Sequence, residues 1–188
     1  MEINKQPTPK VIYATLGGNV DTQMVQRLFN ACSLAVNDGV ETVHLLMHSN
    51  GGQVSDGIGI YNFLRKLPMN IIAYNGGTVA SIAVIIFLAA KQRKASGTAT
   101  FMIHRTHFGA TVPVTSDIAE SIGNMLKIDD GRTDGILQEH IKMPPDKWAT
   151  HQKVELAITA REALDYGLIH EIADFQVPPG NHLFNLNV

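Results

Sequence analysis

The sequence of 188 residues lacks several features that would place it in a special class. It has one cysteine, Cys32, so no internal disulfide can form and a reducing compartment is expected. Its net charge of −2 provides no basic surface for nucleic acid. The longest apolar run, residues 82–90, is too short to span a bilayer, and residues 1–10 do not resemble a signal peptide. These absences predict a soluble cytoplasmic protein that binds neither nucleic acid nor membrane.

The composition is that of a folded domain. Apolar residues make up 45% of the chain and charged residues 17%, which fits a globular protein. The length suits one domain with a substantial core. We expect that domain to occupy residues 1–175 and residues 176–188 to form a C-terminal tail, because the segment is rich in proline, glycine and asparagine.

Apolar β-branched runs alternate with helical patterns in the first half of the chain. Strands are expected at residues 11–16, 43–48 and 71–74. Each is followed by a turn that contains a glycine pair, and then by apolar residues at helical spacing over residues 24–35, 54–67 and 81–90. This order predicts an α/β fold with a mostly parallel sheet, in which chemistry gathers at the carboxyl ends of the strands.

A long helix is expected in the second half, after a strand at residues 98–104. The helix begins at Thr115 or Ser116 and carries an apolar stripe: Ile118, Ile122, Met125, Leu126, Ile136, Leu137 and Ile141. The stripe fits packing against another subunit or folding back on the same domain, and the pattern leaves both open. Beyond residues 143–146, a capping box of Thr159 and Glu162 predicts a short helix.

Ser81 lies between the Gly76-Gly77 turn and a small-residue apolar run. Its hydroxyl is expected at the start of a buried helix, where the helix dipole and free N–H groups favour negative charge. This position suits a nucleophilic serine, because its tetrahedral intermediate carries an oxyanion. A serine that merely caps the helix fits the segment as well.

Four segments in register resemble motifs of the ClpP peptidases. Residues 49–52, Ser-Asn-Gly-Gly, resemble the family's Ser-Pro-Gly-Gly turn, and residues 80–83, Ala-Ser-Ile-Ala, resemble its nucleophile motif. Residues 102–104 match its Met-Ile-His, and residues 157–169 are similar to its Phe-Leu-Ser-Ala-Pro-Glu-Ala-Val-Glu-Tyr-Gly-Leu-Val. The resemblance implies a ClpP/crotonase-like spiral of β-α units, with an inserted long handle helix at about residues 112–142.

The same resemblance implies a serine endopeptidase with a Ser-His-acid triad. Ser81 would be the nucleophile and His104 the general base, with His107 as a rival for that role. Glu155 stands where the family usually has its aspartate. The backbone N–H groups of Gly52 and Ile82 would form the oxyanion hole. No cofactor and no metal is implied.

The resemblance further implies a homo-oligomer, as a heptameric ring or a stacked pair of rings, that encloses peptide or unfolded protein substrates. Asn50 replaces the family's proline beside the oxyanion hole. The chain begins only about ten residues before its first expected strand, whereas ClpP peptidases carry a longer N-terminal segment that helps them couple to an unfoldase. An AAA+ unfoldase partner is therefore left open.

Three alternative functions remain. A free-standing ClpP-like peptidase would work without an unfoldase. A non-catalytic ClpP-like subunit would be expected to have lost the serine or the histidine. A crotonase-type acyl-CoA enzyme would use the same two oxyanion amides but would need neither Ser81 nor His104. The presence of both side chains favours a peptidase over the last two.

Overall fold

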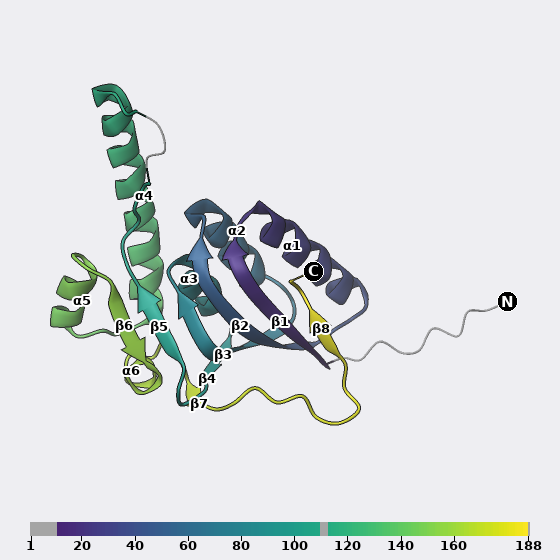
Figure 1. Cartoon of the computed structure of the whole chain (residues 1–188). Helices are drawn as coiled ribbons and strands as arrows, with labels where there is room; N and C mark the ends of the chain where they lie inside the picture. Colours follow the sequence, from purple (N-terminus) through teal and green to yellow (C-terminus); the bar gives the residue numbers. More distant parts are fainter. Residues whose placement is uncertain (1–10, 110–112, 188) are drawn as a thin grey trace.

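The computed structural model describes residues 11–109 and 113–187, which fold around an eight-stranded sheet (Figure 1). The strands are β1 (Val11–Val20), β2 (Thr42–Gly52), β3 (Asn70–Ala80), β4 (Gln92–Ala95), β5 (Thr100–Ile103), β6 (Leu156–Thr159), β7 (Glu171–Ile172) and β8 (Leu183–Asn185). Their order is β6-β5-β3-β2-β1-β8, with β4 pairing β3 and β7. Only β5 and β6 pair antiparallel within the described ranges, so the expected mostly parallel α/β sheet is confirmed.

Three helices cover one face of the sheet, and a fourth projects from the body (Figure 1). The helices are α1 (Thr22–Asn37), α2 (Val54–Leu64), α3 (Ile82–Leu88), α4 (Ser116–His140), α5 (Pro145–His151) and α6 (Ala160–Asp165). The covering layer is α1 to α3, and the projecting helix is α4. In the part of the chain that is described, no helix is both long and apolar enough to cross a membrane.

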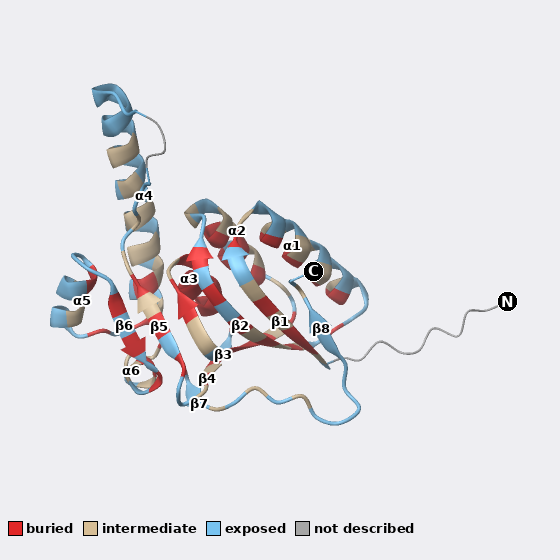
Figure 2. Ribbon diagram, viewed as in Figure 1, coloured by how far each residue is buried: buried red, intermediate tan, exposed pale blue. Residues whose placement is uncertain are grey.

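The core lies between the sheet and the layer of α1 to α3 (Figure 2). Every residue of α3 is buried, and its Phe87 ring packs 5.2 Å from that of Phe101 on β5. Burying large apolar side chains in this way stabilises the fold by about 1.5–3 kcal/mol each. The start of α3 and the end of β5 are therefore anchored in the packed core.

Strands β1, β2 and β3 are longer than the sequence predicts. Turns were expected at Gly17-Gly18 and Gly51-Gly52, but β1 continues to Val20 and β2 to Gly52, so both expectations are wrong. The Gly76-Gly77 pair was likewise expected to form a turn, but β3 continues through it to Ala80, so that expectation is wrong too. The pairing with β2 shifts register here, between Met47 and Ser49. The buried Asn75 amide donates to the Thr100 carbonyl at 2.8 Å, and its oxygen accepts from Gly77 N–H at 3.0 Å. These side-chain bonds satisfy the main chain across the irregularity, so the strand does not end.

The segment after Phe175, expected to be a tail, returns to the sheet. Strand β8 pairs in parallel with β1, and Leu186 N–H donates to the Thr15 carbonyl at 2.9 Å. Phe175 packs edge-on against the rings of Tyr13 and Tyr74, at centroid distances of 6.2 and 5.4 Å. The sequence analysis missed β8, as it missed β4, β6 and α5, because each is a short element.

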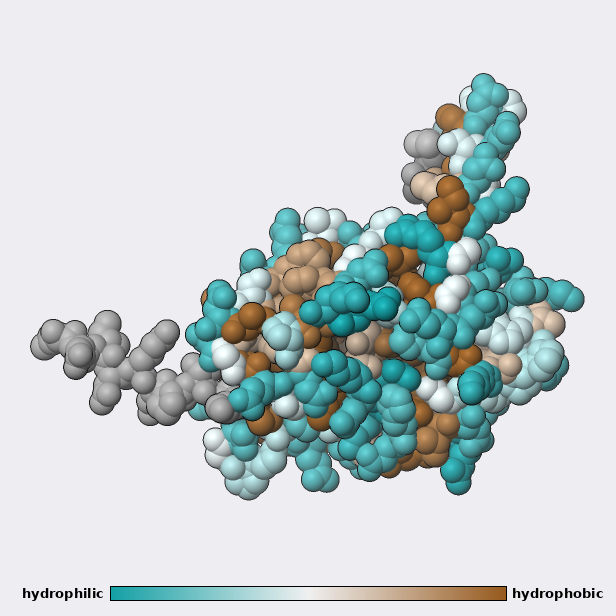
Figure 3. Space-filling model, turned by 180° about the vertical axis from the view of Figure 1, so that it is seen from behind, coloured by the Kyte–Doolittle hydropathy of each residue, from teal (hydrophilic) through white to brown (hydrophobic). Residues whose placement is uncertain are grey.

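Helix α4 begins where the capping pattern predicts. The Thr115 hydroxyl accepts from Ile118 N–H, whereas the expected start of the handle at residue 112 lies outside the described residues. Ile118, Met125 and Ile128 are 48%, 53% and 62% exposed, and apolar side chains are visible along the projecting helix in Figure 3. Leu137 is the only buried residue of α4. Hence only the C-terminal end of the stripe packs on its own domain.

Candidate active site

Ser81 occupies the junction between β3 and α3 in a strained conformation. Its φ of 56° and ψ of −133° make it the one non-glycine residue with positive φ among those described. Such a backbone costs about 1–3 kcal/mol and is found where function requires it. The Ser81 side chain makes no capping hydrogen bond, so the capping interpretation is wrong. A sharp, strained strand-to-helix turn is also how α/β-hydrolases expose a nucleophilic serine.

Residues 49–52, which form the C-terminal end of β2, pack against this junction. Gly51 has a φ of 96°, and a Cβ there would lie 2.6 Å from the Ser81 Cβ, so only glycine fits. The Ser49 hydroxyl donates to the Gly18 carbonyl at 2.6 Å and accepts from Gly51 N–H at 3.1 Å. These bonds fix the end of β2 beside Ser81. Gly52, the last residue of β2, therefore lines a cavity together with Ser81.

His104 reaches the site from the end of β5. Ala80 of β3 pairs with Met102 of β5, and Ser81 N–H donates to the Met102 carbonyl at 2.7 Å. Ser81, Ile82, Gly52 and His104 line one cavity of about 100 Å³. Four of the five site residues expected from the sequence therefore meet at the carboxyl ends of neighbouring strands.

No hydrogen bond joins the Ser81 hydroxyl to the His104 ring within the described ranges. In a protein without substrate, such catalytic hydrogen bonds are often long or poorly aligned, and they tighten on binding. His107 also lines the cavity, and its ring lies 5.0 Å from that of His104. Both histidines thus line the site, and both stay candidates for the general base.

Glu155 does not line the cavity. It directly precedes β6, where Leu156 pairs with Ile103 of β5, so continuing the antiparallel register by one residue sets Glu155 opposite His104. Its side chain is exposed and makes no hydrogen bond or ion pair with any described residue. The backbone register brings residue 155 beside His104, but the carboxylate makes no hydrogen bond or ion pair with the ring.

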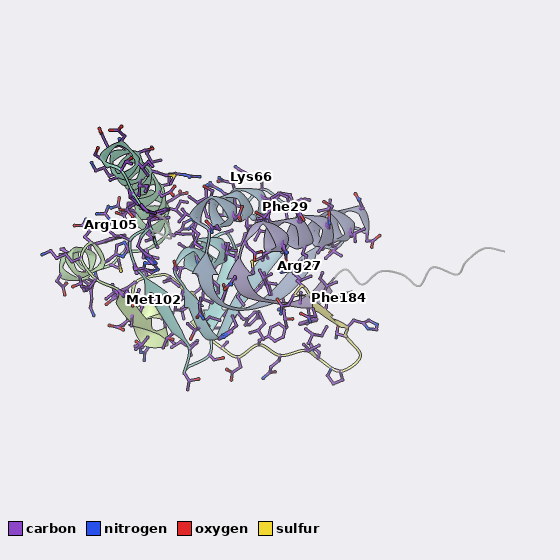
Figure 4. The ribbon with its side chains drawn as sticks, turned by 45° about the horizontal axis from the view of Figure 1, so that its top comes forward. Arg27, Phe29, Lys66, Met102, Arg105 and Phe184 are labelled. Atoms are coloured by element: carbon purple, nitrogen blue, oxygen red, sulfur yellow. The ribbon has the colours of Figure 1, made fainter. Side chains whose placement is uncertain are left out.

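The partner of His104 is instead a main-chain group. Its Nδ1 lies 2.8 Å from the carbonyl oxygen of Arg105. Arg105 in turn extends beside α4 (Figure 4), where its guanidinium pairs with Asp130 at 3.0 Å and Asp134 at 3.4 Å. The sequence analysis missed these three residues, because Arg105 and Asp130 are far apart in the chain and charges on a long helix usually face solvent.

A second cavity offers no comparable chemistry. It measures about 260 Å³, lies between α1 and the sheet, and is lined mainly by apolar side chains. Burial there raises the pKa of the Cys32 thiol to about 11, so Cys32 is not a nucleophile at neutral pH. No group of three or more histidine, cysteine, aspartate or glutamate side chains in residues 11–109 and 113–187 is arranged to hold a metal ion.

Comparison with known proteins agrees with this geometry. The Clp protease family model matches residues 10–176. The "ATP-dependent Clp protease proteolytic subunit 2" of Pseudomonas aeruginosa is 25% identical over 165 residues, which cover 87% of this chain and 81% of that protein. The "proteolytic subunit 3" of Rhizobium meliloti is 26% identical over 157 residues, covering 82% of this chain and 80% of that protein.

A solved structure shares the fold. The ClpP1 of Listeria monocytogenes, solved as a point mutant, superposes with a TM-score of 0.74 over 87% of this chain and 92% of its own. The two sequences are 19% identical, so this likeness concerns the architecture alone.

Proposed function

Because the chain belongs to the Clp protease family, we propose that it is a serine endopeptidase with Ser81 as nucleophile and His104 as general base. The observation that carries the proposal is the strained backbone of Ser81 at the rim of the cavity it shares with His104. Folding retains such strain where a side chain must be aimed at a substrate. The thiol of Cys32 lies on α1 itself, is buried, and lines the second cavity rather than the one that Ser81 lines.

The proposed reaction is acyl transfer to serine followed by hydrolysis. His104 accepts the proton of the Ser81 hydroxyl as the oxygen attacks the peptide carbonyl carbon. The N–H groups of Gly52 and Ile82 stabilise the oxyanion that forms. Ile82 is the first residue of α3, so its N–H has no partner within the helix, and Gly52 lines the same cavity. The protonated His104 then gives its proton to the leaving amine, and water releases the acyl group from Ser81 by the same steps.

Glu155 is proposed as the acid of the triad. Its place opposite His104 in the β5–β6 register would let the carboxylate approach the ring after a change of side-chain rotamer. A negative charge there would stabilise the imidazolium that forms when His104 takes the proton. The extra methylene of glutamate, relative to aspartate, gives the carboxylate the additional reach.

We also propose that the chain assembles into a ring, heptameric or double, that encloses peptide or unfolded protein substrates. Support comes from α4, which holds Ile118, Met125 and Ile128 in solvent. Soluble monomers rarely leave several large apolar side chains exposed on one projecting helix. The curated relatives are named as proteolytic subunits of an ATP-dependent protease, so an ATP-driven unfoldase is a partner to test.

The hydrolysis of unstructured peptides tests the function. A peptide library followed by mass spectrometry should show cleavage by the wild type and a loss of at least about 10³-fold in Ser81→Ala. Ser33→Ala removes an exposed hydroxyl on α1 and should leave the rate unchanged. Cleavage by Ser81→Ala at the wild-type rate would overturn the proposal.

A further inference from the structure

The tautomer of His104 follows from its partner. A carbonyl oxygen can only accept a hydrogen bond, so the 2.8 Å contact with the Arg105 carbonyl requires the proton to be on Nδ1. In the neutral ring, Nε2 then carries the lone pair. A general base needs this form, because the nitrogen that faces the nucleophile must be able to accept a proton.

The main chain that supplies this carbonyl is held by one carboxylate. Asp130 on α4 accepts from Thr106 N–H at 2.7 Å through Oδ1 and from Arg105 Nε at 3.0 Å through Oδ2. The Asp130 side chain is only 13% exposed, so water competes weakly for the bond from Thr106 N–H, whereas the Arg105 side chain is 40% exposed and its bond is the weaker of the two. Charge-assisted hydrogen bonds in such surroundings are about twice as strong as neutral ones. The peptide unit between Arg105 and Thr106 is thus fixed on both sides.

A second carboxylate, that of Asp134, also binds the Arg105 guanidinium. Asp134, one helical turn after Asp130, accepts from Arg105 Nη2 at 3.4 Å and pairs with His151 Nε2 at 2.9 Å. The His151 side chain is 2% exposed on α5, so this end of the network is immobilised by packing. Arg105 is therefore held at two points along α4, which leaves the carbonyl little freedom to turn away from His104.

We propose that Asp130 is a positioning residue for the catalytic base: it holds the Arg105–Thr106 peptide so that the Arg105 carbonyl binds the Nδ1 proton of His104 and Nε2 stays available to Ser81. This inference rests on the proposed function. Helix α4 therefore also has a role within the subunit, because the helix that projects into solvent fixes the Arg105–Thr106 segment that follows His104. The Glu155 carboxylate would add charge stabilisation to a ring whose tautomer is already set.

Three variants test the role of Asp130. Asp130→Ala removes both acceptors and should lower kcat about 10²-fold with KM unchanged, as expected for a misplaced catalytic group. Asp130→Asn keeps an oxygen for Thr106 N–H and should recover much of that loss. Asp129→Ala is the matched control, because the Asp129 carboxylate pairs with Arg132 on the same helix and should leave kcat unchanged.

Nitrogen NMR of the histidine rings provides a readout that general destabilisation would not move. In the wild type and in Asp129→Ala, the His104 signals should report a proton on Nδ1, and in Asp130→Ala a mixture of tautomers. A kcat for Asp130→Ala within twofold of the wild type, or an unchanged tautomer, would overturn the inference. If Asp130→Ala does not fold, Asp130→Asn decides the matter. A kcat several-fold below that of the wild type, with Nδ1 still protonated, supports the inference, because only the acceptor for Thr106 N–H remains, and a kcat identical to that of the wild type overturns it. Cleavage that survives Ser81→Ala would instead refute the proposed function.

Discussion

The main-chain N–H of Ser81 donates a 2.7 Å hydrogen bond to the carbonyl oxygen of Met102, two residues before His104. This bond continues the pairing of β3 with β5 past Ala80 into the strained turn. It ties the segment of the proposed nucleophile to that of the proposed base. The relative position of the two side chains is thus set by the sheet, and a loop contributes only the residues after His104.

The choice between the two histidines can be tested directly. His104→Ala should reduce peptide hydrolysis about as severely as Ser81→Ala, because members of a triad act as a unit. His107→Ala removes a ring that packs 5.0 Å from that of His104 and should cost far less. Steady-state kinetics on both variants decides the matter. An inactive His107→Ala beside an active His104→Ala would show that the base is misassigned.

Loss of the Glu155 charge should impair turnover without unfolding the protein. Glu155→Gln keeps the shape of an exposed side chain, so the thermal midpoint should hold, while kcat falls by orders of magnitude. Glu120→Gln, an exposed position on α4, is the control. Activity of Glu155→Gln within about twofold of the wild type would show that the Glu155 charge is not needed and that Glu155 is not the acid of the triad.

The setting of Ser81 was predictable from the local sequence, whereas the roles of His104, Glu155, Gly52 and Ile82 followed from the resemblance to the ClpP peptidases. Ser81 at the start of an apolar run and His104 at the end of a strand meet since parallel strands end at one edge of a sheet. The continuation of β3 through Gly76 was not predictable, because it depends on the buried amide of Asn75 reaching Thr100 on another strand. Glycine pairs usually indicate turns, and a tertiary contact overrode that tendency here.

The support of His104 could not be predicted for a similar reason. Thr106 and Asp130 are joined only when α4 folds against the segment after β5. A sequence pattern identifies the faces of a helix but not the distant residue that each charge will contact. The return of the chain end to β1 is equally non-local, since β8 has only three residues and gains its partner after a long connection.

Charge placed on the exposed stripe should break the assembly. Met125→Glu would put a carboxylate into the proposed contact between subunits, where burying an unpaired charge is costly. Light scattering should show dissociation together with loss of activity. Lys127→Gln, two residues along and on the other side of the helix, should leave the particle size unchanged. A wild-type protein that is a stable and active monomer would refute the assembly.

Stability should rise with pH across the range in which histidine titrates. Burial lowers the pKa of His140 below its usual value of 6.5, and it does the same for His44 and His170. Between the folded and unfolded pKa values the unfolded chain binds more protons, so the free energy of unfolding increases with pH and levels off above about 6.5. Urea unfolding at several pH values measures this slope. His140→Gln should reduce it, whereas replacement of the exposed His182 should not.

Covalent labelling of the purified protein with a fluorophosphonate tests the central claim most directly, since it requires no knowledge of the substrate. An activated Ser81 oxygen attacks phosphorus and expels fluoride, which leaves a stable adduct on the serine. The account predicts one adduct per chain, mapped by mass spectrometry to the peptide that contains Ser81 and absent from Ser81→Ala. Labelling that persists in Ser81→Ala, or a wild-type protein that is never labelled, would contradict it.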